Sequence, residues 1–460
     1  MTSPVRRSDS GIAHFVIRKF FIRHSRTTLL GDHSTDDSKP STDQARWMKR
    51  LPFALLGLAS LLHAEESTKR FDFGDATAAP GSIAVRSTDL FDATKGYGFE
   101  PGRTISSVDR GGDPWGGDFI TGEGGFYFST ELPEGNYEVA VTLGDLKGES
   151  DTTIKAECRR LMLEDIKTAN GKQVVKKLVV NVRRPEIAGG DKVRLKAREV
   201  PYLHWDHKLT LEFNGPRPAI AGIEIKAVEV PTVYLMGDST VTDQPFEPWN
   251  SWGQMVTRFF KPDIAIANYA ESGESIKSSL SANRFKKAYA NLKKGDWMLM
   301  QFGHNDMKDK SPDALETYRR NLEEIVATVR AKQATPIIIT SMERKGGVKT
   351  DTLGGYPDAV RDVAKRLNVQ LIDLHAMSRE LYVGLGSELD QAFQDGTHHN
   401  NFGSYEIAKC VIEGVRENAP ELAAHLAEDA GKFDPSHPDK PADFHVALSP
   451  TSDAAKPDGN

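Results

Sequence analysis

The sequence predicts an α/β protein in which an all-β sandwich precedes a doubly wound parallel sheet. Across residues 65–228, short segments rich in β-branched and aromatic residues follow one another with turn signals between them. This pattern, without helical periodicity, is typical of a sandwich. Across residues 229–430, apolar runs alternate with helical patterns. Such alternation predicts parallel strands covered by helices on both faces.

The expected elements follow the chain in order, and no internal repeat interrupts them. The sandwich strands are expected at 71–74, 126–130, 137–144, 152–157, 176–183, 192–198, 208–215 and 221–230. The α/β region is expected to have strands at 233–236, 263–269, 296–303, 336–342 and 369–374, and helices at 276–292, 315–332, 358–367 and from about Gly403. Residues 431–460 are rich in Pro and Asp and are expected to form a linker-like, partly disordered tail.

The N-terminal part predicts export. Residues 1–47 are polar and lean basic, whereas residues 48–64 combine a basic start, a short apolar run and a small residue, Ala64, before Glu65. This is the pattern of a signal peptide, and the run is too short for an ordinary membrane span. We interpret residues 1–47 as a non-native or disordered extension, with translation starting at Met48 rather than Met1. Alternatively, a disordered tail precedes a short anchoring or buried helix.

Charge and cysteine content exclude some classes of protein. The chain has 59 Lys and Arg against 65 Asp and Glu, for a net charge of -6. The charge is balanced, so the composition does not indicate a nucleic-acid partner. Cys158 and Cys410 alone cannot make a disulfide scaffold, and we expect them in different domains without a bridge.

The segment 232–243, TVYLMGDSTVTD, is the first candidate for chemistry. Its apolar run ends at Gly237, and Asp238, Ser239 and Thr240 follow. The pattern predicts a buried strand, a tight turn and the start of a helix. Ser239 would then lie at the carboxyl end of a strand, where open α/β sheets bind ligands, with its N–H beside a helix N-terminus. Alternatively, Ser239 only caps the helix.

Three further segments follow predicted strands or precede the last helix. Gly273 allows close backbone approach and offers an N–H, and Asn305 offers a side-chain amide to an oxyanion. Each is also a common turn residue. Asp395 stands three residues before His398, so it can hold one imidazole nitrogen while the other takes a proton from a serine such as Ser239. Alternatively, this is a solvated loop with an Asp cap.

A metal site is a competing interpretation, because His304, His398 and His399 are available together with several Asp residues. Adjacent histidines rarely ligate one ion, and the sequence has no His-x-x-x-His spacing. We therefore expect no metal and no other cofactor.

In this order, the segments resemble the SGNH (GDSL-like) esterases, and GDST, QFGHND and DGTH are similar to the rhamnogalacturonan acetylesterase branch. The resemblance implies a flavodoxin-like sheet, with Ser239 as nucleophile and His398 as general base oriented by Asp395. It also implies an oxyanion hole formed by the N–H groups of Ser239 and Gly273 and the amide of Asn305. The sandwich, through YGFE and RRLMLE, is similar to the galactose-binding-like domains that precede such esterases.

Three residues are candidate substrate contacts. Arg344 lies in the loop after the strand at 336–342, on the same sheet edge as Ser239, and would bind the carboxylate of a uronate. Alternatively, this is a solvated basic loop. Glu274 stands where the branch often has Arg, and would oppose an anionic substrate. His304 lies in the same block as Asn305.

The expected function is an exported, periplasmic or extracellular carbohydrate esterase that removes acetyl groups from a pectic polysaccharide. Its partner would be this acetylated polymer, with no nucleic acid and no stable membrane span after leader cleavage. The alternatives are an acylhydrolase acting on xylan or lipid, and a non-catalytic glycan-binding protein. The presence of Ser239, Asp395 and His398 argues against the last of these.

Overall fold

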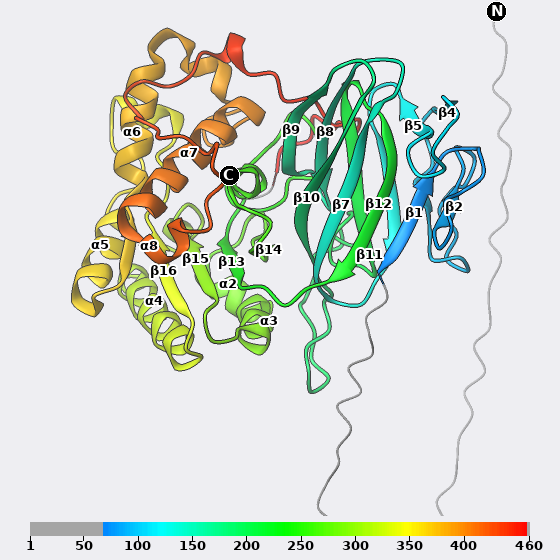
Figure 1. Cartoon of the computed structure of the whole chain (residues 1–460). Coiled ribbons are helices and arrows are strands. Elements are labelled where there is room, and N and C mark those ends of the chain that lie inside the picture. Colours follow the sequence, from blue (N-terminus) through cyan, green and yellow to red (C-terminus); the bar gives the residue numbers. More distant parts are fainter. Residues whose placement is uncertain (1–67, 458–460) are drawn as a thin grey trace, which may run out of the picture. The chain divides into compact units, whose positions relative to one another are not determined.

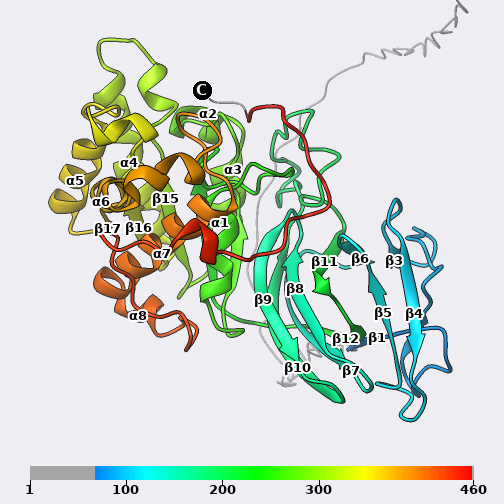
Figure 2. The same ribbon diagram turned by 90° about the horizontal axis from the view of Figure 1, so that it is seen from above.

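The computed structural model describes residues 68–457, which belong to one compact unit (Figures 1 and 2). The expected extension and leader, residues 1–47 and 48–64, lie outside the described residues. An all-β region is followed by a parallel sheet with helices, so the predicted fold class is confirmed. Within the described residues, none of the helices has the length and apolar character needed to cross a bilayer.

The sandwich consists of two mainly antiparallel sheets. One has the order β10-β7-β12-β1-β2, with β5 beside β12 and β4 beside β5, and the other has the order β3-β6-β11-β8-β9. The strands are β1 Lys69–Phe73, β2 Ile83–Val85, β3 Tyr97–Phe99, β4 Ile105–Asp109, β5 Asp118–Gly122, β6 Phe126–Glu131, β7 Gly135–Asp145, β8 Ser150–Ala156, β9 Arg160–Thr168, β10 Lys172–Val182, β11 Lys208–Arg217 and β12 Ile220–Ala227.

Aromatic rings fill the space between these two sheets. The Phe128 ring lies 5.1 Å from that of Phe71 and 4.9 Å from that of Phe73, both in edge-to-face contact. Edge-to-face pairs stabilise a core beyond the area that they bury. The aromatic residues that suggested strands are therefore the ones that hold the sandwich together.

The α/β region is a sheet of five parallel strands in the order β14-β13-β15-β16-β17. Its strands are β13 Thr232–Gly237, β14 Ala265–Asn268, β15 Trp297–Gln301, β16 Thr335–Ile339 and β17 Gln370–Ile372. Its helices are α1 Trp252–Met255, α2 Ile276–Ser281, α3 Arg284–Asn291, α4 Ala314–Ala331, α5 Tyr356–Leu367, α6 Leu374–Leu385, α7 Asn401–Asn418 and α8 Pro420–Ala423. Short 3₁₀ helices are η1 Val256–Phe259, η2 Asp306–Lys308, η3 Lys345–Val348, η4 Gly386–Ala392 and η5 Pro441–Asp443.

Each face of this sheet has its own apolar core because successive side chains point to opposite faces. Val233 and Leu235 pack with α1, α6, α7 and α8, whereas Tyr234 and Met236 pack with α2, α3, α4 and α5. The strand order reverses between β13 and β15, and open sheets bind ligands beside such a reversal. The segments after β13, β14 and β15 therefore meet at the edge expected to carry the site.

Several expected elements are wrong. The helix predicted directly after Ser239 is a turn, and α1 starts only after the Ser251 cap. The single helix predicted at 276–292 is two helices, because Asn283 adopts a left-handed conformation with φ 63° between them. Helix α6 was not predicted; it follows β17 at once, with Asp373 capping its N-terminus.

The predicted strand at 192–198 is also wrong. This segment leaves the sandwich and contacts the α/β region, where Val193 packs in the core beside α3. The Lys196 ammonium lies 2.9 Å from Glu274, and the Arg198 guanidinium lies 2.5 Å from Glu271. Of the alternating apolar residues that suggested a strand, Val193 is buried and Leu195 is partly buried against the other region, whereas Ala197 is exposed.

The C-terminal segment is more ordered than the expected linker-like tail. Its last described part, residues 447–457, is called the C-terminal strap below. Lys155 of β8 donates to the carbonyl of Ala447 at 2.7 Å, and the Glu247 N–H donates to the carbonyl of Thr451 at 2.9 Å. The strap is thus hydrogen-bonded to the sandwich and to the α/β region, and Figure 2 shows it in red between them.

Buried arginines of the sandwich hold the loop that follows Ser239. Arg159, in the turn between β8 and β9, lies 2.6 Å from Glu247 and donates to the carbonyls of Gln244 and Trp249 at 3.0 and 2.9 Å. Its side chain and that of Glu247 are both almost fully buried. A buried charge needs its partner, so this pair fixes the position of the loop.

We expect Arg159→Met to destabilise the folded chain by about 3–5 kcal/mol, because Glu247 would keep a buried charge without its main partner. The double variant Arg159→Met/Glu247→Leu should regain much of this loss. Urea unfolding followed by fluorescence measures both, with the exposed Arg86→Met as control. Equal midpoints for Arg159→Met and Arg86→Met would show that the pair does not hold the fold.

Candidate active site

A tight turn presents Ser239 at the end of β13. The Asp238 carboxylate accepts from the N–H and hydroxyl of Thr240 at 2.9 and 2.8 Å, and the Asp238 carbonyl accepts from Val241 N–H at 3.0 Å. A Cβ atom on Gly237 would lie 2.4 Å from a Val241 methyl carbon, so only glycine fits there. The local sequence therefore places the serine hydroxyl at the carboxyl edge of the sheet.

The structure brings Ser239, His398 and Asp395 into one hydrogen-bonded chain. Ser239 Oγ lies 2.8 Å from His398 Nε2, and His398 Nδ1 lies 2.9 Å from Asp395 Oδ2. Asp395 Oδ1 accepts from the backbone N–H groups of Thr397 and His398 at 2.7 and 2.6 Å. Because a carboxylate only accepts, Nδ1 carries the proton and Nε2 accepts from the serine. This arrangement can move a proton from Ser239 to His398.

Asp395 stays ionised in this setting. Burial by itself would raise the pKa of Asp395, but hydrogen bonds from the ring and backbone of His398 hold it well below its usual value. A carboxylate that remains charged at acidic pH can orient the imidazole and stabilise the imidazolium that forms during catalysis.

His399 points away from this chain of hydrogen bonds. Its Nε2 lies 3.1 Å from the Tyr382 hydroxyl, and its ring packs on Phe393 with centroids 4.1 Å apart. Burial lowers the pKa of His399 to about 3, so this imidazole is neutral above that pH. The two adjacent histidines therefore have different surroundings. Only His398, at the spacing Asp-x-x-His, bonds to Asp395.

The candidate donors for an oxyanion are the N–H groups of Ser239 and Gly273 and the side-chain amide of Asn305. Gly273 has φ 80°, a conformation that favours glycine. Within residues 68–457, neither the N–H of Ser239 nor that of Gly273 donates to a protein acceptor. The Asn305 amide donates to the Glu274 carbonyl at 3.1 Å, and its oxygen accepts from Lys308 at 3.0 Å. These bonds orient the amide and place it next to the Gly273 loop, with one N–H left for a ligand.

The three residues expected to contact substrate, Glu274, His304 and Arg344, all bond to other groups of the protein. Glu274 is buried and paired with Lys196, so its charge is compensated rather than presented to a ligand. His304 is also buried: Nε2 donates to the Met342 carbonyl at 2.9 Å, and Nδ1 lies 3.2 Å from Asp238 Oδ2.

Arg344 braces loops around the site. Its guanidinium donates to the Thr397 hydroxyl at 3.2 Å, to the Thr352 carbonyl at 3.1 Å and to the His304 carbonyl at 3.4 Å. With its donors directed at these groups, Arg344 does not have the outward, bidentate arrangement expected for uronate binding.

Sequence reasoning missed several residues that surround the triad. Trp249 packs edge-to-face on His398 with centroids 5.8 Å apart, and Lys456 Nζ lies 3.3 Å from Asp395 Oδ2. A cavity of about 120 Å³ lies beside them and is also lined by Tyr202, Phe246 and Arg198. These residues come from three distant parts of the chain and belong to no local motif, so no sequence signal identified them.

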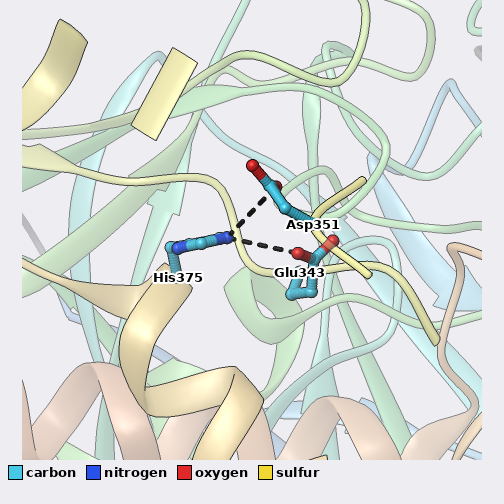
Figure 3. Close-up of side chains that lie close together, drawn as sticks. All are labelled: Glu343, Asp351 and His375. Carbon is cyan, nitrogen blue, oxygen red and sulfur yellow. Dashed lines mark hydrogen bonds and ion pairs between the residues drawn. The ribbon is translucent and has the colours of Figure 1, made fainter. Parts of the chain in front are cut away.

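A cluster of possible metal ligands, away from the triad, is formed by Glu343, Asp351 and His375 (Figure 3). Its geometry does not suit a metal. The Arg361 guanidinium lies 3.1 Å from His375 Nδ1 and can only donate, so Nδ1 accepts and Nε2 carries the proton. Nε2 then donates to Glu343 Oε2 at 3.2 Å, and a protonated nitrogen cannot ligate an ion.

Comparison with known proteins gives consistent matches for both regions. Residues 235–404 match the GDSL-like Lipase/Acylhydrolase family, and residues 69–173 match the Beta-agarase/YXIM esterase-like, galactose-binding domain-like family. Rhamnogalacturonan acetylesterase RhgT of Bacillus subtilis (strain 168) is 34% identical over 44% of this chain and 96% of its own length. The uncharacterized esterase YxiM of the same strain is 24% identical over 81% of this chain and 98% of its own length. The crystal structure of YxiM covers 76% of this chain and 98% of its own, with 22% identity and a TM-score of 0.41.

The two adjacent histidines provide a matched pair of variants. We expect His398→Gln to lower kcat on the order of 10³-fold, because it removes the group that takes the serine proton. We expect His399→Gln to lower it less than about tenfold, since His399 contacts only the surrounding core. Steady-state rates on a small aryl acetate measure both, and the reverse order of effects would contradict the assignment.

Proposed function

Because the chain belongs to the GDSL-like lipase/acylhydrolase family, we propose that it is an esterase. Its substrate would be a pectic polysaccharide, from which it would remove acetyl groups after export. The observation that carries the proposal is the hydrogen-bonded chain from Ser239 through His398 to Asp395. The N–H groups of Ser239 and Gly273, which have no acceptor within residues 68–457, support it. Export is supported by the leader pattern at residues 48–64.

The mechanism follows from this geometry. Ser239 Oγ attacks the carbonyl carbon of the acetyl ester while His398 Nε2 takes its proton. The N–H groups of Ser239 and Gly273 and the amide of Asn305 stabilise the oxyanion of the tetrahedral intermediate, each by about 3 kcal/mol. His398 then protonates the leaving sugar oxygen, and the acetyl group stays on Ser239.

The second half of the reaction reuses the same groups. A water molecule gives a proton to His398 Nε2 and attacks the acetyl-enzyme carbonyl carbon, and the same donors hold the oxyanion. Collapse of the second tetrahedral intermediate releases acetate, and His398 returns the proton to Ser239 Oγ. Asp395, which stays ionised, stabilises the imidazolium in both halves.

A carbohydrate substrate is supported by the relatives and by the cleft. RhgT is a rhamnogalacturonan acetylesterase by name. The cavity that Trp249 and Lys456 help to line has three aromatic rings, from Tyr202, Phe246 and Trp249, together with charged side chains of both signs. Aromatic rings with polar neighbours suit the apolar faces and hydroxyl groups of sugars.

A pectic polymer is supported by an exposed cation at the site. Lys308 is exposed and lies next to Asn305, where it can contact a uronate carboxylate. This role was expected for Arg344, which is directed at protein groups instead. A neutral polymer such as xylan would gain nothing from the charge of Lys308.

We expect Ser239→Ala to lower the release of acetate from acetylated polysaccharides on the order of 10³-fold or more, because only binding of the transition state remains. A panel of acetylated rhamnogalacturonan, homogalacturonan and xylan, with acetate measured enzymatically, tests activity and polymer class together. Retention of more than a tenth of the parent rate by Ser239→Ala would remove the nucleophile assignment. Faster turnover of xylan than of either pectic polymer would overturn the pectic assignment.

We expect Lys308→Met to raise KM for acetylated pectin several-fold and to leave KM for a neutral aryl acetate within about twofold. The reason is that the charge contributes to binding only of a charged substrate, whereas loss of the hydrogen bond to Asn305 would change kcat on both substrates alike. The neighbouring exposed Lys310→Met is the control, and added salt should reduce the difference between the variants. Equal effects of Lys308→Met on both substrates would count against a uronate contact.

A further inference from the structure

The C-terminal strap reaches the triad directly. Lys456 Nζ lies 3.3 Å from Asp395 Oδ2, the same oxygen that accepts from His398 Nδ1 at 2.9 Å. One carboxylate oxygen is therefore shared between an imidazole and an ammonium. The Asp395 side chain is mostly buried, whereas about half of the Lys456 side chain is exposed.

A second contact of the strap supports the ring of His398. Trp249 Nε1 donates to the Asp453 carbonyl at 3.1 Å, and Asp453 N–H donates to the Glu247 carbonyl at 3.0 Å. Trp249 in turn packs edge-to-face on His398. The strap thus holds Trp249 through Asp453, and three residues later its Lys456 contacts the Asp395 carboxylate.

We propose that Lys456 is a positioning residue of the triad, whose ammonium orients Asp395 and opposes protonation of His398. The proposal rests on the proposed function, because it assigns Lys456 a role in the same ester hydrolysis. It makes the end of the chain part of the active site rather than a tail.

The sign of the effect follows from Coulomb's law. A cation that shares the Asp395 carboxylate withdraws part of the negative charge that would stabilise an imidazolium at His398, and it repels that imidazolium directly. His398 must be neutral to take the serine proton, so Lys456 keeps the base active to lower pH. Solvent around the half-exposed ammonium limits the size of the effect.

Other charged groups near the pair remain in place when Lys456 is changed. The loop after β16 contributes Arg344, which bonds to Thr397, and η2 contributes Lys308, an exposed residue whose pKa is lowered by partial desolvation and by Arg344. The buried pair of Asp238 and His304 lies after β13 and β15. His399 and Lys345, which pairs with Asp390, also adjoin this loop, and the cavity beside Lys456 is lined by the charged residues Arg198, Asp243, Glu271 and Asp453. These groups set a constant background against which a change at Lys456 is measured.

The test is the pH profile of kcat/KM on a neutral aryl acetate. Lys456→Met keeps the stem and removes the charge, and we expect it to move the acid limb to higher pH by about half a unit. Lys456→Arg, which keeps a cation, should restore the parent profile. Exposed Lys440→Met, from the same C-terminal segment, is the control and should leave the profile unchanged.

The outcomes separate this inference from the proposed function. An inactive parent protein would overturn the proposed function itself. An active parent whose acid limb is the same in Lys456→Met and Lys440→Met would overturn only the role of Lys456. A lower plateau with an unshifted acid limb would also overturn it, because that is the result of packing alone. A limb that moves to lower pH would contradict the predicted sign of the electrostatic effect.

Discussion

The buried ion pairs between sandwich arginines and the loop after Ser239 are the constraint on which the site depends. Arg183 and Arg160 lie 3.0 and 3.5 Å from Asp243, and Arg159 lies 2.6 Å from Glu247, all of them buried. Charges without water must be paired, so this loop cannot move without leaving a charge uncompensated. The same loop carries Trp249, which packs on His398. The sandwich therefore shapes the active site, whatever it binds by itself.

The site is a composite of three parts of the chain. The α/β region supplies the residues proposed as nucleophile, base and oxyanion donors, at the carboxyl edge of its sheet. The segment between β10 and β11 supplies Arg198 and Tyr202, and the C-terminal strap supplies Lys456. A composite site explains why the polar groups behind the triad are so densely paired: each loop that reaches the site needs partners for its buried charges and backbone groups.

The parts of the site that follow strands directly were predictable from the sequence. Ser239, Gly273 and Asn305 each stand a few residues after an apolar run, and the sheet order brings such positions together. The environment of Arg344 was not predictable, because its partners come from loops far along the chain. The polar composition of the C-terminal segment suggested solvation, although backbone hydrogen bonds and Lys456 tie it to the site. In the 192–198 segment, Val193 was recognised as apolar but the surface that buries it was not.

Covalent labelling with a fluorophosphonate tests whether His398 activates Ser239, because this reagent modifies a serine only where a neighbouring base activates it. The labelled protein would be digested and the modified peptide identified by mass spectrometry. We predict one label for each chain, on Ser239. A label on another residue, or no label at a pH at which Asp395 and His398 are in their active states, would contradict it.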